Sequence, residues 1–471
     1  MGIVKKLNLV NPRKSRVKFN RFYGIDTTYD GSVGGYNKAS YTYNLAYKDG
    51  ALKSTLGLKD LYKTYPFDDK YHIASIYFYN RKDYEKGESD DRLVVCTDDG
   101  SVYDCPASGG DFQPIKGLSF SQQPTGVCYN YNGKDVIFLS SEKDGLIMYD
   151  GETWQKVDGA PPITSMCIHS ERLFITSGGV DGALWFSDDF DPTNWNISLS
   201  EAGFIDLGNA RGEMLCVLPL GSHLFVFTSF GVSRITAYGD QTEFSVSHLL
   251  VSCGKIFKNT VMHCGDCIMF FASDGLYRFD GYDAVRVSDP WFNLVDPNPD
   301  WVKGVYFNGY AYFLLNFIVD GKSQSGVLMT KPNGSDSVIL LVGMVSEIAV
   351  VKSDDEYKLL AYERLYRCIC ECKEGEGFCG DEIDMAWHSK RSDFGISAKI
   401  KRLTEVSLNS NLPLKLTVEA DGKESCYSLI PKRGKCVVKP NIYGNEFAFK
   451  IEVAGVEVEI SGLELEFSYY R

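Results

Sequence analysis

The densest group of side chains that could do chemistry is a run of cysteines near residue 370. Cys368, Cys370 and Cys372 alternate along the sequence, and Cys379 and His388 follow them. Residues that alternate in a β-strand share one face, so these thiolates could together hold a zinc ion. The spacing is not that of a zinc ribbon, in which two residues separate the cysteines of each pair. We therefore interpret them as reduced thiols and expect neither a bound metal nor metal dependence.

A second cysteine pair, Cys264 and Cys267 in "HCGDC", has the two-residue spacing of metal knuckles and redox motifs. It lies between two apolar runs that read as strands, and no matching second pair accompanies it. This context favours a plain turn.

Three acids in "SDDFDPTNW", Asp188, Asp189 and Asp191, could contact calcium. They lack the every-second-residue spacing of a calcium loop. Asp and Asn side chains also form hydrogen bonds to their own backbone, so we interpret this segment too as a turn.

No constellation in the sequence specifies catalysis. Gly-x-Ser-x-Gly is missing, and the six histidines stand in no evident triad context. Glycosidases need paired carboxylates, and no spacing marks such a pair among the 62 acids. The Ser-x-Asp-x-Gly-x-x-Trp box of propeller sialidases has no match in "SDGLYRF". We expect a protein that is not an enzyme and uses no cofactor.

The elements that would position these side chains are recurrent β-hairpins. The hairpin "KDGLIMYDGETWQKV" (143–157) returns as "SDGLYRFDGYDAVRV" (273–287), and similar hairpins recur at intervals of roughly 35–50 residues. Runs such as "VIFLS" (136–140) are apolar on both faces, which is typical of strands covered on both sides, as in stacked propeller blades. The sequence predicts a β-propeller, with seven blades preferred and six or eight as alternatives.

The last 90 residues have a different texture. Alternating apolar positions, for example Phe447, Phe449, Ile451 and Val453, predict half-buried antiparallel strands. The predicted fold is therefore all-β, with a C-terminal antiparallel β-sandwich after the propeller. The predicted domains are a basic N-terminal arm (1–36), a strand pair that could close the propeller (37–65), the propeller (66–380) and the sandwich (381–471).

Charge is distributed unevenly along the 471 residues. The net charge is −13, which argues against duplex DNA as a partner for the whole surface. The first 21 residues contain no acid, and we expect their basic side chains to dock on an acidic partner or phosphate, or to form a solvated tail. These residues are Lys5, Lys6, Arg13, Lys14, Arg16, Lys18 and Arg21.

The sequence lacks the marks of export or membrane insertion. The N-terminus has no apolar core of signal-peptide length, and no apolar run approaches a membrane span. We expect synthesis in a cytoplasm, where the 14 cysteines stay reduced.

Four stretches, in chain order, resemble the β-propeller tail proteins of tailed bacteriophages, the hub or nozzle family that includes packaged-DNA stabilization proteins. They are "YNLAYKDGALKSTLGLKDL" (43–61), "SERLFITSGGVDGALWFSDDFDPTNWN" (170–196), "LCVLPLGSHLFVFTSFGVSRIT" (215–236), and "MAWHSKRSDFG" (385–395) with the ending from residue 445. Together they span most of the chain, each loosely. The cysteines, the "CICEC" strand and the polar segment "CKEGEGFCGD" depart from the family's pattern.

The resemblance implies a virion structural protein in the tail or neck, below the portal and assembled in the host cytoplasm. It implies a homo-oligomeric ring of about six copies that contacts the portal or adaptor and other tail proteins. Such a ring extends the DNA exit channel and helps retain packaged DNA. An acidic body agrees with transient, non-specific contact, because like charge lets a passing duplex slide.

Two other functions suit a propeller. One is a receptor-binding protein that binds or cleaves glycans. The other is a cytosolic interaction propeller, which is disfavoured because its Gly-His and Trp-Asp signature is missing.

Overall fold

The computed structural model describes residues 12–28, 35–62, 71–177, 182–208, 211–249, 253–296, 302–319, 321–341, 343–353, 356–396 and 399–469. Contacts divide the chain into two compact units. The propeller unit comprises Leu58–Gly334 and Val342–Cys372, and the sandwich unit comprises Met1–Gly57, Ser335–Leu341 and Lys373–Arg471.

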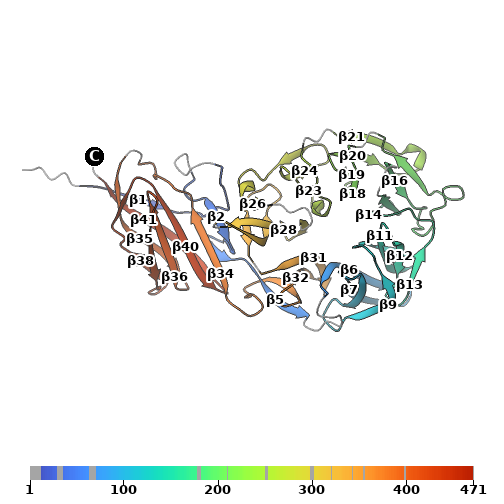
Figure 1. The fold of residues 1–471 in the computed structure, drawn as a ribbon, viewed down its shortest axis with the longest axis horizontal. Coiled ribbons are helices and arrows are strands. Elements are labelled where there is room, and N and C mark those ends of the chain that lie inside the picture. The colour runs from blue at the N-terminus through green and yellow to red at the C-terminus, as the bar shows by residue number, and fades with distance from the viewer. Residues whose placement is uncertain are drawn as a thin grey trace, which may run out of the picture. The chain divides into compact units, whose positions relative to one another are not determined.

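In the described part of the propeller unit, successive antiparallel strands form seven groups, which we call blades 1 to 7, and a bridge between Asp83 and Lys134 joins the first two into one hydrogen-bonded sheet (Figure 1). Blade 1 consists of β6 (Ile73–Asp83), β7 (Glu88–Thr97), β8 (Ser101–Pro106) and β9 (Gln113–Ser119). Blade 2 consists of β10 (Thr125–Tyr131), β11 (Lys134–Ser141), β12 (Gly145–Tyr149) and β13 (Trp154–Val157). Blade 3 consists of β14 (Ser165–His169), β15 (Arg172–Thr176), β16 (Ala183–Phe186) and β17 (Gly203–Asp206). Blades 4 to 7 consist of β18 (Met214–Leu220), β19 (His223–Thr228), β20 (Gly231–Thr236), β21 (Ser245–Leu249); β22 (Met262–Cys264), β23 (Cys267–Ala272), β24 (Gly275–Phe279), β25 (Ala284–Arg286); β26 (Val295–Asp296), β27 (Lys303–Phe307), β28 (Tyr310–Val319), β29 (Lys322–Thr330); β31 (Val345–Ser353), β32 (Glu356–Glu363), β33 (Cys368–Glu374), β5 (Leu56–Tyr62).

These blades close into a ring. The inner strands β6, β10, β14, β18, β22, β27 and β31 each contact the next one, and β31 contacts β6 again. The last blade takes its outer strand, β5, from the N-terminal part of the chain, so the two ends of the propeller meet within one sheet. Figure 1 shows the blades arranged around a common centre.

The apolar character of both strand faces has a direct structural cause. In β11, Ile137 packs with Val94 of blade 1, whereas its neighbour Phe138 packs with Leu173 and Ile175 of blade 3. Alternate residues of one strand thus enter the cores on its two sides. This double burial confirms the predicted propeller and explains why these strands do not alternate with polar residues.

The repeated Asp-Gly hairpins are structural parts of blades 2 and 5. Asp150 accepts hydrogen bonds from the backbone N–H groups two and three residues ahead, at 2.9 and 2.7 Å, and Asp280 accepts the same pair, both at 2.9 Å. The following glycines, Gly151 and Gly281, have φ of 91° and 99°, a conformation that favours glycine. Both copies therefore encode the turn between the third and fourth strands of a blade.

The sandwich unit packs two antiparallel sheets around one core. The first sheet contains β1 (Arg13–Lys18), β3 (Leu45–Lys48), β4 (Ala51–Ser54), β35 (Lys401–Ser410), β38 (Lys435–Val438), β39 (Ile442–Gly444) and β41 (Glu459–Tyr469), and the second contains β2 (Ala39–Tyr43), β34 (Ile383–Ser389), β36 (Leu414–Ala420), β37 (Lys423–Leu429) and β40 (Phe447–Gly455). Buried Phe467 of the first sheet and Trp387 and Phe449 of the second belong to this core. The predicted antiparallel sandwich, and with it the all-β fold class, is confirmed.

The strand assignments near the N-terminus differ from the expected domain limits. Residues 13–18 form strand β1, paired with β41, where a basic arm was expected over 1–36. Of the strands expected over 37–65 to close the propeller, only β5 does so, whereas β2, β3 and β4 belong to the sandwich unit. Alternation identifies a strand, but pairing with residues hundreds of positions away decides which sheet it joins.

Candidate functional site

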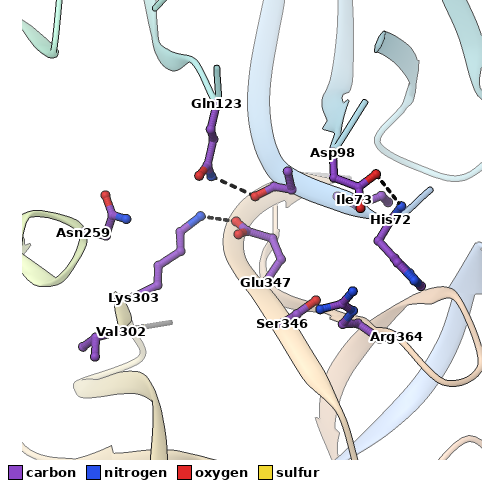
Figure 2. Close-up of a pocket in the computed structure, with 11 residues that line it drawn as sticks. His72, Ile73, Asp98, Gln123, Asn259, Val302, Lys303, Ser346, Glu347 and Arg364 are labelled. Carbon is purple, nitrogen blue, oxygen red and sulfur yellow. Dashed lines mark hydrogen bonds and ion pairs between the residues drawn. The ribbon is translucent and has the colours of Figure 1, made fainter. Parts of the chain in front are cut away.

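A cavity of about 230 Å³ in the propeller lies where several inner strands begin (Figure 2). Its lining comes from blades 1, 2, 5, 6 and 7 and from the turns that connect second and third strands in blades 1 and 7. The lining residues are His72, Ile73, Ala74, Asp98, Gln123, Asn259, Val302, Lys303, Ser346, Glu347 and Arg364.

An ion pair between neighbouring inner strands forms one wall of this cavity. Lys303 opens β27, and its ammonium contacts the carboxylate of Glu347 in β31. The Glu347 side chain is only 2% exposed, against 27% for Lys303. Burial raises the pKa of Glu347, and the adjacent Lys303 ammonium offsets part of that rise. The pair thus links blades 6 and 7 by charge.

Another part of the cavity lining is organised around His72, just before β6. Its backbone N–H donates to Asp98 at 3.1 Å, and its Nδ1 lies 3.0 Å from the Tyr362 hydroxyl. Burial lowers the pKa of His72, the nearby Arg364 and Arg367 lower it further, and Asp98 opposes them. The imidazole is therefore held toward its neutral form.

The remaining polar groups of the lining come from other parts of the ring. Gln123 reaches across from blade 2 and donates to the Ala74 carbonyl at 2.8 Å. The Ser346 hydroxyl is buried and has no hydrogen-bond partner among the described residues. Within the lining, the Glu347 carboxylate is engaged by Lys303 and the His72 imidazole by a tyrosine, so no nucleophile is paired with a base. The cavity can accept a small polar group.

Within the propeller unit, the fold brings together two of the cysteines that could hold zinc. The Cys368 and Cys370 sulfurs, both buried in β33, lie 3.1 Å apart. Asp60 of β5 joins them, with its carboxylate 3.9 Å from the Cys370 sulfur. Cys372 is half-buried further along β33.

The other two candidate ligands belong to the sandwich unit. Cys379 is half-buried there, and His388 lies in β34 with its Nδ1 3.1 Å from the Ser40 hydroxyl.

The "HCGDC" segment is the turn that its context predicts. Cys264 and Cys267 are directly opposite each other where β22 turns into β23, and Gly265 has a φ of 70°. Burial raises the pKa of both thiols, so neither is held as a reactive thiolate.

The acids of "SDDFDPTNW" also form a turn. Asp191 accepts hydrogen bonds from the backbone and hydroxyl of Thr193, at 3.0 and 2.6 Å, and Asp188 accepts from the Asn194 amide at 2.8 Å. Two carboxylates of the cluster are thus bonded within their own segment.

The basic residues expected to dock on a partner lie mostly along strand β1. The glutamates of β41 pair with them: Glu466 lies 3.1 Å from Lys14 and 3.2 Å from Arg16, and Glu464 lies 3.1 Å from Lys18. Exposed Arg13 opens the strand, Arg21 lies 3.6 Å from Asp336, and Lys5 and Lys6 fall outside the described residues. The described charges therefore help to hold an edge strand of the sandwich.

Sequence reasoning missed the cavity and the role of Asp60. The cavity side chains come from five blades, and each stands at the start of a strand or in a turn with no shared spacing. Asp60 lies more than 300 residues before Cys368 in the sequence. Among the sequence signals, only the predicted closure of the ring by residues 37–65 could have placed Asp60 near Cys368.

Comparisons with known proteins give no family for this chain. No family model matches, and no curated protein matches. Among solved structures, the chain is similar to Raptor of Chaetomium thermophilum (9% identity, TM-score 0.38, covering 68% of this chain and 29% of Raptor). It is also similar to BBS1N in complex with ARL6DN (11% identity, TM-score 0.41, covering 67% of this chain and 96% of BBS1N). A third similar structure is PorZ of Porphyromonas gingivalis (11% identity, TM-score 0.35, covering 79% of this chain and 57% of PorZ).

These likenesses are distant, and the chain spans less than two thirds of Raptor and of PorZ. Among the described residues, no helix has the length and apolarity needed to cross a membrane.

Proposed function

We propose that this protein is a non-catalytic structural protein of a bacteriophage virion, located in the tail hub or nozzle below the portal. There it forms a homo-oligomeric ring that extends the DNA exit channel and helps retain packaged DNA. Its partners are the portal or adaptor and other tail proteins, and it assembles in the host cytoplasm.

The observation that carries the proposal is where the family-like stretches lie in the fold. Residues 43–61 run from the β3–β4 hairpin into the ring-closing strand β5. Residues 170–196 contain two strands of blade 3 and its aspartate-rich turn, and residues 215–236 contain most of blade 4. The resemblance therefore follows structural units in order, and none of it depends on a reactive site.

The mechanical and electrostatic properties of the chain suit this role. Blades 1 to 4 are held on both faces by apolar cores, so a load on one of them is shared with its neighbours. The net charge of −13 repels DNA phosphates, so the channel wall does not retain a passing duplex.

Electron microscopy of the purified chain, alone and with the portal complex, tests the proposal. We expect negative-stain images to show rings, or rings that appear when portal is added. Images that show only monomers in both samples contradict it. Labelling this protein on native particles is expected to mark the tail or neck.

The polar cavity of the propeller supports a second candidate, a receptor-binding protein that recognises glycans. The cavity is lined by Gln123, Asn259 and Arg364, whose planar polar groups face one space. Such groups can form hydrogen bonds with the hydroxyls of a sugar. Specific binding or cleavage of host-wall polysaccharides that is abolished by Asn259→Ala would favour this function. Binding that survives this change would place the glycan elsewhere.

A further inference from the structure

The seam that closes the propeller carries a convergent set of metal-binding groups. In blade 7, β33 lies next to β5, so residues from distant parts of the chain meet across one strand pair. The carboxylate of Asp60 and the sulfurs of Cys368 and Cys370 all lie within 4.8 Å of one another. Between the two cysteines, Ile369 points into the opposite face and is fully buried in an apolar core.

These distances fit one metal ion. Zinc bound to two thiolates at about 2.3 Å in a tetrahedron places the sulfurs about 3.7 Å apart, and a carboxylate oxygen slightly closer. The observed separation of the two sulfurs, 3.1 Å, is shorter than the zinc value for that pair, and the 3.9 Å from the Cys370 sulfur to the Asp60 carboxylate is longer than the zinc value for that pair. Small side-chain rotations would bring all three atoms onto a common ion.

The donor types select the metal. Two soft thiolates and one carboxylate favour zinc over calcium or magnesium, which prefer oxygen ligands only. Zinc displaces one proton from each thiol, so binding releases two protons to water and strengthens as the pH rises. The spacing argument against zinc considered the cysteines alone, whereas folding adds an acid from β5.

We propose that Asp60, Cys368 and Cys370 bind a structural zinc ion that fastens strand β5 to strand β33 and so locks the propeller ring. Tetrahedral coordination of zinc requires one further ligand. Ring closure depends on the pairing of two distant chain segments, and a metal bridging them resists opening at that seam. This inference does not depend on the proposed virion function.

Elemental analysis of the full chain, purified under reducing conditions with zinc and then desalted, tests the proposal. We expect about one zinc ion per chain in the wild type, and a loss of most of it in Cys368→Ser, Cys370→Ser and Asp60→Asn. Cys264→Ser removes an equally buried thiol from another blade and is expected to retain the zinc.

Two measurements on the wild-type chain keep the test independent of variant folding. Cobalt added to the reduced, metal-free protein is expected to produce thiolate-to-cobalt charge-transfer absorption. Chelation is expected to raise amide hydrogen exchange in residues 56–62 by about tenfold, because the seam then opens locally. A wild-type chain without stoichiometric zinc and without that absorption overturns the proposal, as do variants that keep their zinc.

Discussion

The buried ion pair between Lys303 and Glu347 allows a quantitative test of what holds adjacent blades together. Lys303→Met removes the ammonium and leaves the carboxylate almost fully buried, since Glu347 is only 2% exposed. Removing one partner of a buried pair costs 3–5 kcal/mol in general. Because Lys303 keeps 27% of its side chain in solvent, we expect the lower end, about 3 kcal/mol at pH 8.

The pH dependence of this loss has a definite sign. Burial already raises the pKa of Glu347 above its ordinary 4.5, and loss of the lysine raises it further. Between pH 4.5 and that raised value the folded state binds more protons than the unfolded state, so stability falls as the pH rises. The variant should therefore recover stability near pH 5.

Urea denaturation at pH 5 and pH 8, with hydrogen exchange in β27 and β31 as the local probe, measures the effect. Lys322→Met, an exposed lysine in the same blade, is the control and should change stability by less than about 0.5 kcal/mol. The double variant Lys303→Met/Glu347→Met should lie close to wild type, because neither charge is left unpaired. A Lys303→Met penalty below about 1 kcal/mol at pH 8, or one equal at both pH values, refutes this reasoning.

Three further changes test other parts of the fold. Burial by itself raises the pKa of Asp26, but hydrogen bonds from Lys38 and, at 3.0 Å, from Lys390 hold that pKa well below 3.8. Asp26→Asn should therefore reduce the free energy of unfolding, measured by urea denaturation at pH 7, by about 2 kcal/mol. The loss should become progressively smaller as the pH falls below 3.8. Leu58→Ala in the closing strand, where Leu58 is 1% exposed, should cost about 3 kcal/mol and speed limited proteolysis of the propeller, and an unchanged proteolysis rate would contradict its role in closure. Asp280→Ala should cost about 1 kcal/mol in thermal or urea unfolding because two turn N–H groups lose their acceptor, whereas no loss would mean that water replaces it.

The local sequence determined the turns and strand patterns of the blades. In residues 143–157 and 273–287, Asp-Gly pairs specify turns through hydrogen bonds to the next backbone N–H groups, and this information is local. Runs such as 136–140 are apolar on both faces because each strand is buried between two blades. Fold class could therefore be predicted from spacing and periodicity alone.

Only the tertiary structure decided which distant segments meet. The assignment of residues 13–18 to the sandwich, of β5 to blade 7, and of Asp60 to the side of Cys370 all depend on pairings across hundreds of residues. The lining of the propeller cavity likewise comes from five blades, each contributing side chains at the start of a strand or in a turn. Local hydrogen bonding and periodicity act within a few residues, whereas ring closure is fixed by the packing of the whole chain.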